Sequence, residues 1–79
     1  MRVMEWKVDS DCEEVRIESS HFSTEKGRDY LKIEEMQYSG EGIEVNQVVA
    51  SSFAVTFISN GGIGTGGFVL HWSCHQTGT

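Results

Sequence analysis

The sequence has no proline, only two cysteines, and half as many basic as acidic residues. The absence of proline argues against polyproline linkers. Six lysines and arginines against twelve acids give a formal net charge of −6, which disfavours nucleic acid as a partner because phosphate binding requires basic side chains. No apolar run approaches the length of a membrane span, and the N-terminus lacks the charged, apolar and small-residue order of a signal peptide. The start of the chain is compatible with an initiator methionine, an added residue or an excised domain.

The composition is that of one small globular domain. Hydrophobic residues make up 38% and charged residues 23% of the 79 positions, so the chain can bury a core, although a small one. Nine glycines predict many turns. We therefore treat residues 1–79 as a single domain, whose acidity is compatible with cationic partners or a bound divalent metal.

The clearest pattern is strict alternation of apolar and polar residues on both sides of a glycine-rich stretch. Phe53–Phe57 alternates before that stretch, and in Phe68–Cys74 every second residue is apolar or cysteine. Alternation with a period of two is typical of half-buried strands. Asn60–Gly66 between them is mostly glycine, which allows sharp turns. The sequence predicts an antiparallel pair of core strands joined by this glycine-rich hairpin, with Trp6 and Trp72 packed in the core.

Further segments of the same kind precede this pair, separated by turn residues about every ten positions. This spacing predicts an all-β fold, a sandwich or barrel of six or seven strands. The turns are expected at Asp9–Asp11, Thr24–Arg28 and Ser39–Gly42. The strands are expected at Met4–Val8, Glu13–Ser19, Asp29–Glu34, Met36–Tyr38 and Ile43–Val49.

The two cysteines, Cys12 and Cys74, lie near opposite ends of the chain. If they pair, the long loop they close stabilises the fold by roughly 4 kcal/mol in the chain-entropy description. In a reducing compartment they would be two buried thiols. Cys12 falls on the outward face of its expected strand, so pairing requires a β-bulge or the end of the strand to turn it inward.

Gly27–Ile33 contains the pattern Asp-Tyr-Leu-x-Ile, and Val55–Asn60 ends in Phe-x-Ser-Asn. These segments resemble, in order, those of the CUB domain, an extracellular β-sandwich module with an Asp-Tyr-Leu-x-Ile strand and a strand ending in Phe-x-Ser-Asp. The chain is shorter than a CUB domain, lacks its early strands, and has two cysteines in place of four. The remaining matching segments are Phe22–Glu25, Tyr38–Gly40 and Gly67–Trp72.

The resemblance implies a compact antiparallel sandwich of jelly-roll type, an extracellular or secreted location, and a Cys12–Cys74 disulfide. It also implies a Ca²⁺ site formed by Glu25, Asp29 and Asn60, beside which acidic side chains would receive a basic side chain of a partner. Calcium binds six to eight oxygens, several of them anionic, and Asn60 in place of Asp removes one charge. The alternative is that Glu25 and Asp29 are solvated turn residues.

Three other sites have the right residue types but the wrong pattern. A zinc site of Cys12, His71, Cys74 and His75 is disfavoured because Cys74 points away from the two histidines, which lie far apart along a strand. A nucleophilic set of Glu18, Ser20 and His21 rests on adjacency alone, so we do not expect an enzyme. The glycine-rich loop precedes a strand, whereas a phosphate-binding loop precedes a helix.

We therefore expect a non-catalytic binding module that recognises a protein partner through its end loops, Ser23–Asp29 and Ser59–Gly67. The partner contacts are expected at Asn60, Gly61, Gly62 and Thr65. One alternative is a small structural or assembly subunit that pairs through an edge strand at Ile43–Val49. Another is a glycan-binding domain, for which Trp6 or Trp72 would be exposed rather than buried.

Overall fold

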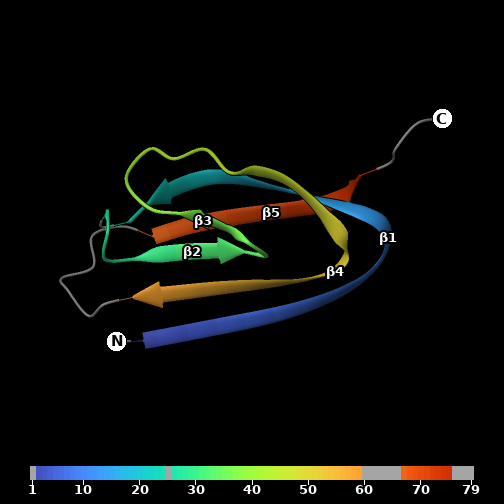
Figure 1. Ribbon diagram of the computed structural model, residues 1–79. Helices are drawn as coiled ribbons and strands as arrows, with labels where there is room; N and C mark the ends of the chain where they lie inside the picture. Colours follow the sequence, from blue (N-terminus) through green and yellow to red (C-terminus); the bar gives the residue numbers. More distant parts are fainter. Residues whose placement is uncertain (1, 25, 60–66, 76–79) are drawn as a thin grey trace.

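A computed structural model describes residues 2–24, 26–59 and 67–75. The described residues form five strands in one antiparallel sheet, with the strand order β3-β2-β4-β1-β5 (Figure 1). The all-β prediction is therefore confirmed. The strands are β1 (Arg2–Ser23), β2 (Tyr30–Ile33), β3 (Met36–Tyr38), β4 (Asn46–Ser59) and β5 (Gly67–His75).

The two long strands, β1 and β4, pair along most of their lengths and bend together (Figure 1). Residues 2–9 of β1 pair with 52–59 of β4, and residues 14–18 pair with 46–50, with a register shift between Asp9 and Glu14. β2 pairs with the second half of β4, whereas β5 pairs with the second half of β1. The sheet thus has two halves that are continuous through β1 and β4, rather than two separately bonded sheets.

Register shifts along β1 decide which side chains enter the core. Even-numbered residues such as Trp6 and Val8 pair with the inward-facing Val55 and Phe53 of β4, but after the first shift the buried residues are Val15 and Ile17. A second shift between Ser19 and His21 brings Phe22 inward again. β1 has three more residues than β4 across the first shift and one more than β5 across the second, and each odd difference exchanges the two faces. The turn expected at Asp9–Asp11 is wrong: this segment is the first irregularity within β1.

The core forms between the two halves of the bent sheet. Among the described residues nine hydrophobic side chains are buried, and Ile17, Leu31 and Ile33 have no exposed surface. Phe22 of β1 contacts Tyr38 of β3 with ring centroids 6.5 Å apart, so residues distant in the sheet meet across the core. The buried set is Val15, Ile17, Phe22, Leu31, Ile33, Val45, Val49, Phe53 and Val55.

The predicted hairpin between Phe53–Phe57 and Phe68–Cys74 is wrong. Both segments are strands, but β1 lies between β4 and β5 in the sheet, and no pairing joins β4 to β5 among the described residues. The alternation specifies which face is apolar but not which strand is the neighbour. Two further expectations also change. Ile43–Val49 is not a separate edge strand, because β4 begins at Asn46 and continues to Ser59. The described part of the chain contains five strands, where six or seven were expected.

Candidate functional site

An apolar groove lies between the first half of β1 and strand β5. Its volume is about 200 Å³. Trp6 and Val8 of β1 and Val55 of β4, which pairs with Trp6, line it together with side chains of β5. We call it the β1–β5 groove. Its lining residues are Trp6, Val8, Val55, Phe68, Leu70 and Trp72.

The groove exists because the two halves of the sheet are offset when they pack. Phe68 of β5 contacts Phe57 of β4 with centroids 5.1 Å apart, and Trp72 of β5 contacts Phe53 of β4 at 5.9 Å. β5 therefore covers β4, while the second half of β1 covers β2 and β3 through Phe22. On the inner face of the first half of β1, Val8 packs against the core, whereas Met4 and Trp6 are 40% and 43% exposed.

The uncovered side chains are large and apolar. Trp6 is 43%, Trp72 52% and Met4 40% exposed, although all three lie on the face that carries the core elsewhere in the sheet. The expectation that both tryptophans pack in the core is therefore wrong. Alternation assigned them to the correct face, but a side chain on that face is buried only where another strand lies opposite.

Two strand edges border the groove. Within the described chain, β5 has β1 as its only hydrogen-bonded neighbour, and residues 2–9 of β1 have β4 as theirs. Edge strands usually carry charged residues, proline or bulges that prevent pairing with another chain. β5 contains no lysine, arginine, aspartate or glutamate between Gly67 and His75. The groove thus combines exposed apolar side chains with free backbone hydrogen-bonding groups.

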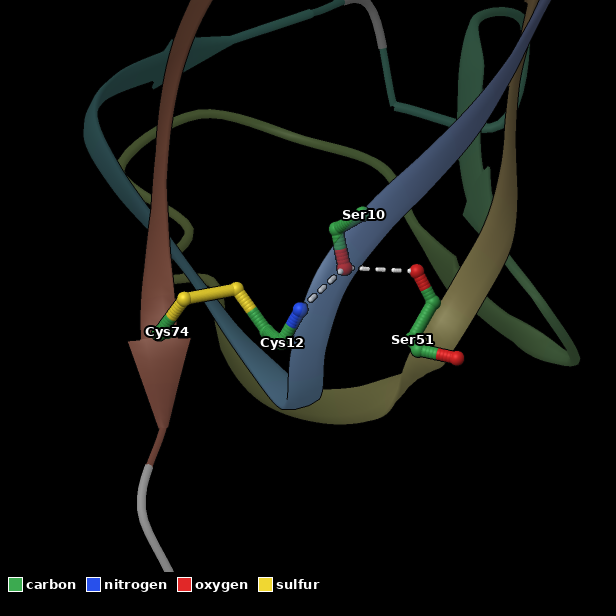
Figure 2. Close-up of a disulfide and its surroundings, with 4 residues drawn as sticks. All are labelled: Ser10, Cys12, Ser51 and Cys74. Carbon is green, nitrogen blue, oxygen red and sulfur yellow. Dashed lines mark hydrogen bonds between the residues drawn. A yellow bond between two sulfur atoms is a disulfide. The ribbon is translucent and has the colours of Figure 1, made fainter.

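The disulfide between Cys12 and Cys74 fastens β5 to the bend of β1, and the predicted pairing is confirmed (Figure 2). The Cα atoms are 5.2 Å apart. Ser10 stabilises the same bend: its hydroxyl donates to the carbonyl oxygen of Ser51 at 2.7 Å and accepts from the N–H of Cys12 at 3.3 Å. As expected, an irregularity in β1 turns Cys12 toward its partner.

The residues of the predicted calcium site are only partly described. Glu25 and Asn60 lie outside the described residues, as do the predicted loop contacts Gly61, Gly62 and Thr65, so those predictions stay as they are. Asp29 is buried, with 7% of its surface exposed, and its carbonyl oxygen accepts a hydrogen bond from the hydroxyl of Ser39 at 2.7 Å. The described residues contain no group of three or more potential metal ligands.

The histidines of β5 lie on the outer face, away from the groove. The ring of His71 is 3.1 Å from the hydroxyl of Ser20, and that of His75 is 3.4 Å from the guanidinium of Arg16. The disulfide removes both thiols from the rejected zinc set. Ser20 of the rejected catalytic set contacts His71 of the neighbouring strand.

Tyr38 takes part in a hydrogen-bond network that the sequence did not predict. Its hydroxyl donates to the side-chain oxygen of Gln47 at 2.7 Å, and the amide of Gln47 donates to the carbonyl oxygen of Ile33 at 3.2 Å. Burial raises the pKa of Tyr38 above its ordinary value of 10.0. This chain of hydrogen bonds links β3, β4 and β2.

Comparison of the chain with protein-family models, with curated proteins and with solved structures finds no match. No helix that could cross a membrane occurs in residues 2–24, 26–59 and 67–75. The resemblance to the CUB domain stays a prediction from the sequence.

Proposed function

We propose that the protein is a non-catalytic, extracellular binding module that recognises a protein partner at the β1–β5 groove. The observation that carries the proposal is the exposure of Trp6 and Trp72 on the two sides of one apolar groove. Tryptophan is enriched at binding hot spots because it buries a large apolar area and keeps a polar N–H. The disulfide supports an oxidising compartment such as the extracellular space.

The partner surface that fits this groove is an extended segment with alternating apolar side chains. Such a segment can add as a strand to the free edge of β5, where its backbone would gain hydrogen bonds. Every second side chain would then point into the groove, over Trp6 and Leu70. The predicted loop contacts remain part of this proposal, because Phe68 of the groove follows the loop directly in sequence.

A glycan is the second candidate, because exposed tryptophans provide stacking surfaces for sugar rings. Sugar hydroxyls also require hydrogen-bonding side chains near the stacking ring. All six side chains that line the groove belong to apolar or aromatic residue types, with only the indole N–H groups as polar atoms. The composition of the groove therefore favours a polypeptide over a glycan.

The test is a binding experiment with short extended peptides, followed by NMR of the isotope-labelled protein. One peptide alternates apolar and polar residues, and its matched control has the same composition in a scrambled order. We expect the alternating peptide to shift the amide signals of β5 and to slow their hydrogen exchange, as strand addition requires.

Two variants test whether the groove is the site. Trp72→Ala and Leu70→Ser are expected to abolish binding, whereas Val48→Ala, a change at an exposed apolar residue outside the groove, should leave it unchanged. Equal binding of both peptides, or binding insensitive to the two groove variants, would contradict the proposal. Binding of oligosaccharides that is lost in Trp72→Ala would instead favour the glycan candidate.

A further inference from the structure

The free edge of β1 has a property that β5 lacks: an ordered set of charges. Arg2, Glu5, Lys7 and Asp9 carry two positive and two negative charges, so this segment is neutral although the chain carries a net charge of −6. Glu5 and Lys7 lie opposite Thr56 and Ala54 of β4, which are uncharged. Their charges therefore have no opposite charge across the strand pair.

The hydrogen-bonding groups at this edge can be assigned from one bond on β4. The carbonyl oxygen of Ala54 accepts from the N–H of Glu34, so the backbone of Ala54 points toward β2 and that of Val55 points toward β1. Trp6 pairs with Val55 and therefore uses its backbone groups within the sheet. By the same alternation, the backbone groups of Val3, Glu5, Lys7 and Asp9 point to the free edge.

We propose that a second copy of this chain pairs with the edge formed by residues 2–9, antiparallel and in one register. The two-fold axis passes between the two Trp6 residues. Glu5 of each copy then lies opposite Lys7 of the other, and these residues exchange backbone hydrogen bonds. Across the eight edge residues of each copy, the pairing provides about eight interchain hydrogen bonds.

Charge complementarity selects this register over its neighbours. In a two-fold symmetric pairing, facing residues lie on the same side of the sheet. The neighbouring registers therefore place the two-fold axis one residue earlier or later along the strand, at Glu5 or at Lys7. An axis at Glu5 would place Glu5 against Glu5, and one at Lys7 would place Lys7 against Lys7. Like charges directly opposite one another are destabilising, whereas opposite charges stabilise the pair.

The apolar side chains fit the same register. With the axis at Trp6, Met4 of each copy faces Val8 of the other, and the two indoles face one another. Trp6 then occupies a non-hydrogen-bonded position, where the side chains of facing residues lie closest. The pairing covers part of Met4 and Trp6, which are 40% and 43% exposed in the single chain. It also joins the two sheets into one.

The interface is one strand wide, so the association should be weak and dependent on concentration. Sedimentation of the wild-type protein from low micromolar to millimolar concentration should show a shift from monomer to dimer. A far-ultraviolet exciton signal from the facing indoles should grow with the dimer and disappear in Trp6→Phe. A wild-type protein that stays monomeric over this range would overturn the proposal.

Charge exchange tests the register without altering the groove. Glu5→Lys and Lys7→Glu each make both facing pairs repulsive, and each should raise the dissociation constant roughly tenfold or more. Their controls are Glu35→Lys and Lys32→Glu, which make the same charge changes at exposed residues away from this edge and should dimerise like the wild type.

Two combinations complete the test. An equimolar mixture of Glu5→Lys and Lys7→Glu chains should form a heterodimer, and a chain carrying both changes should again dimerise with itself. Circular dichroism and melting curves of each variant check that it folds. Dimers that tolerate both single changes, or a mixture that gains no dimer, would overturn this register. The peptide experiment on β5, carried out in the Glu5→Lys background at low protein concentration, is read separately from these outcomes, because self-association then does not cover Trp6 of the groove.

Discussion

Removing the disulfide should cost the domain a large part of its stability. Cys12 and Cys74 are separated by 62 positions, for which the chain-entropy relation gives about 4 kcal/mol at 25 °C. A domain of 79 residues has a total stability of about 4–12 kcal/mol. The double variant Cys12→Ser/Cys74→Ser should therefore keep about 0–8 kcal/mol, and at the low end of this range it lies at its folding midpoint in water. The change acts chiefly on the unfolded chain, which gains freedom that the bridge removes.

The measurement is reversible urea unfolding followed by circular dichroism, on the oxidised wild type, the reduced wild type and the double variant. Cys74 is exposed, so a reductant reaches the bond in the folded protein. The reduced wild type and the double variant should lose the same amount, because both lose only the covalent link. Intact mass before and after reduction confirms the state of the bond.

An unfolded double variant still allows the measurement. Sulfate or trimethylamine N-oxide, added equally to all three proteins, favours the folded state and brings the variant into the measurable range. A loss below about 1 kcal/mol under matched conditions would refute the reasoning, because a 62-position link should restrict the unfolded chain far more than that.

Four other predictions follow from particular contacts. Ser10→Ala should destabilise the fold by about 1–2 kcal/mol in urea unfolding, because it removes both hydrogen bonds that hold the bend of β1; an unchanged midpoint would contradict this role. Ile17→Ala should cost about 2–5 kcal/mol because Ile17 is fully buried, and a loss typical of a surface residue would place Ile17 outside the core. Gly27→Ala should cost about 1 kcal/mol because Gly27 has a φ of 78°; a gain in stability would argue against that backbone conformation. Burial raises the pKa of Tyr38, so Tyr38 should ionise above pH 10.0 in a spectrophotometric titration. As the pH rises, the unfolded chain releases this proton before the folded protein does. The stability contributed by Tyr38 is therefore present below about pH 10 and is lost as the pH rises through the folded-state pKa. Ionisation at the free-tyrosine value would contradict the burial of Tyr38.

The resemblance to the CUB domain adds one prediction about metal. Millimolar Ca²⁺ should raise the melting temperature, because a ligand that binds only the folded state stabilises it. Glu25→Gln should abolish this rise, and Glu35→Gln serves as the matched control. A melting temperature that does not respond to Ca²⁺ would remove the calcium site and the docking of a basic side chain beside it.

Local alternation was sufficient to predict most of the strands. Leu31 and Ile33, the alternate apolar residues of the expected strand Asp29–Glu34, are buried in β2, and Phe53 and Val55 are buried in β4. These predictions succeed because the side-chain period of a strand is a local property. The need for a bulge near Cys12 was also visible, because parity placed its side chain on the wrong face for pairing.

Strand neighbours and burial could not be predicted in the same way. The glycine-rich segment indicated a hairpin, but β1 lies between β4 and β5 because pairing depends on contacts between segments distant in sequence. Parity placed Trp6 and Trp72 on the inner face, yet their exposure depends on how the two halves of the sheet are offset. Alternation therefore predicted the apolar face on which the lining residues of the groove lie, but it could not predict the groove itself.

Both proposals depend on an uncovered inner face of β1, and acrylamide quenching of single-tryptophan proteins measures this directly. Trp72→Phe leaves Trp6 as the only tryptophan, and Trp6→Phe leaves only Trp72. Both variants also carry Glu5→Lys and are measured in dilute solution, so that self-association does not cover Trp6. The account predicts that acrylamide quenches each indole efficiently and that each emits as a solvent-exposed tryptophan, in agreement with exposed fractions of 43% and 52%. Blue-shifted emission with strong protection of both indoles would show that another part of the chain covers the groove, and would contradict the account.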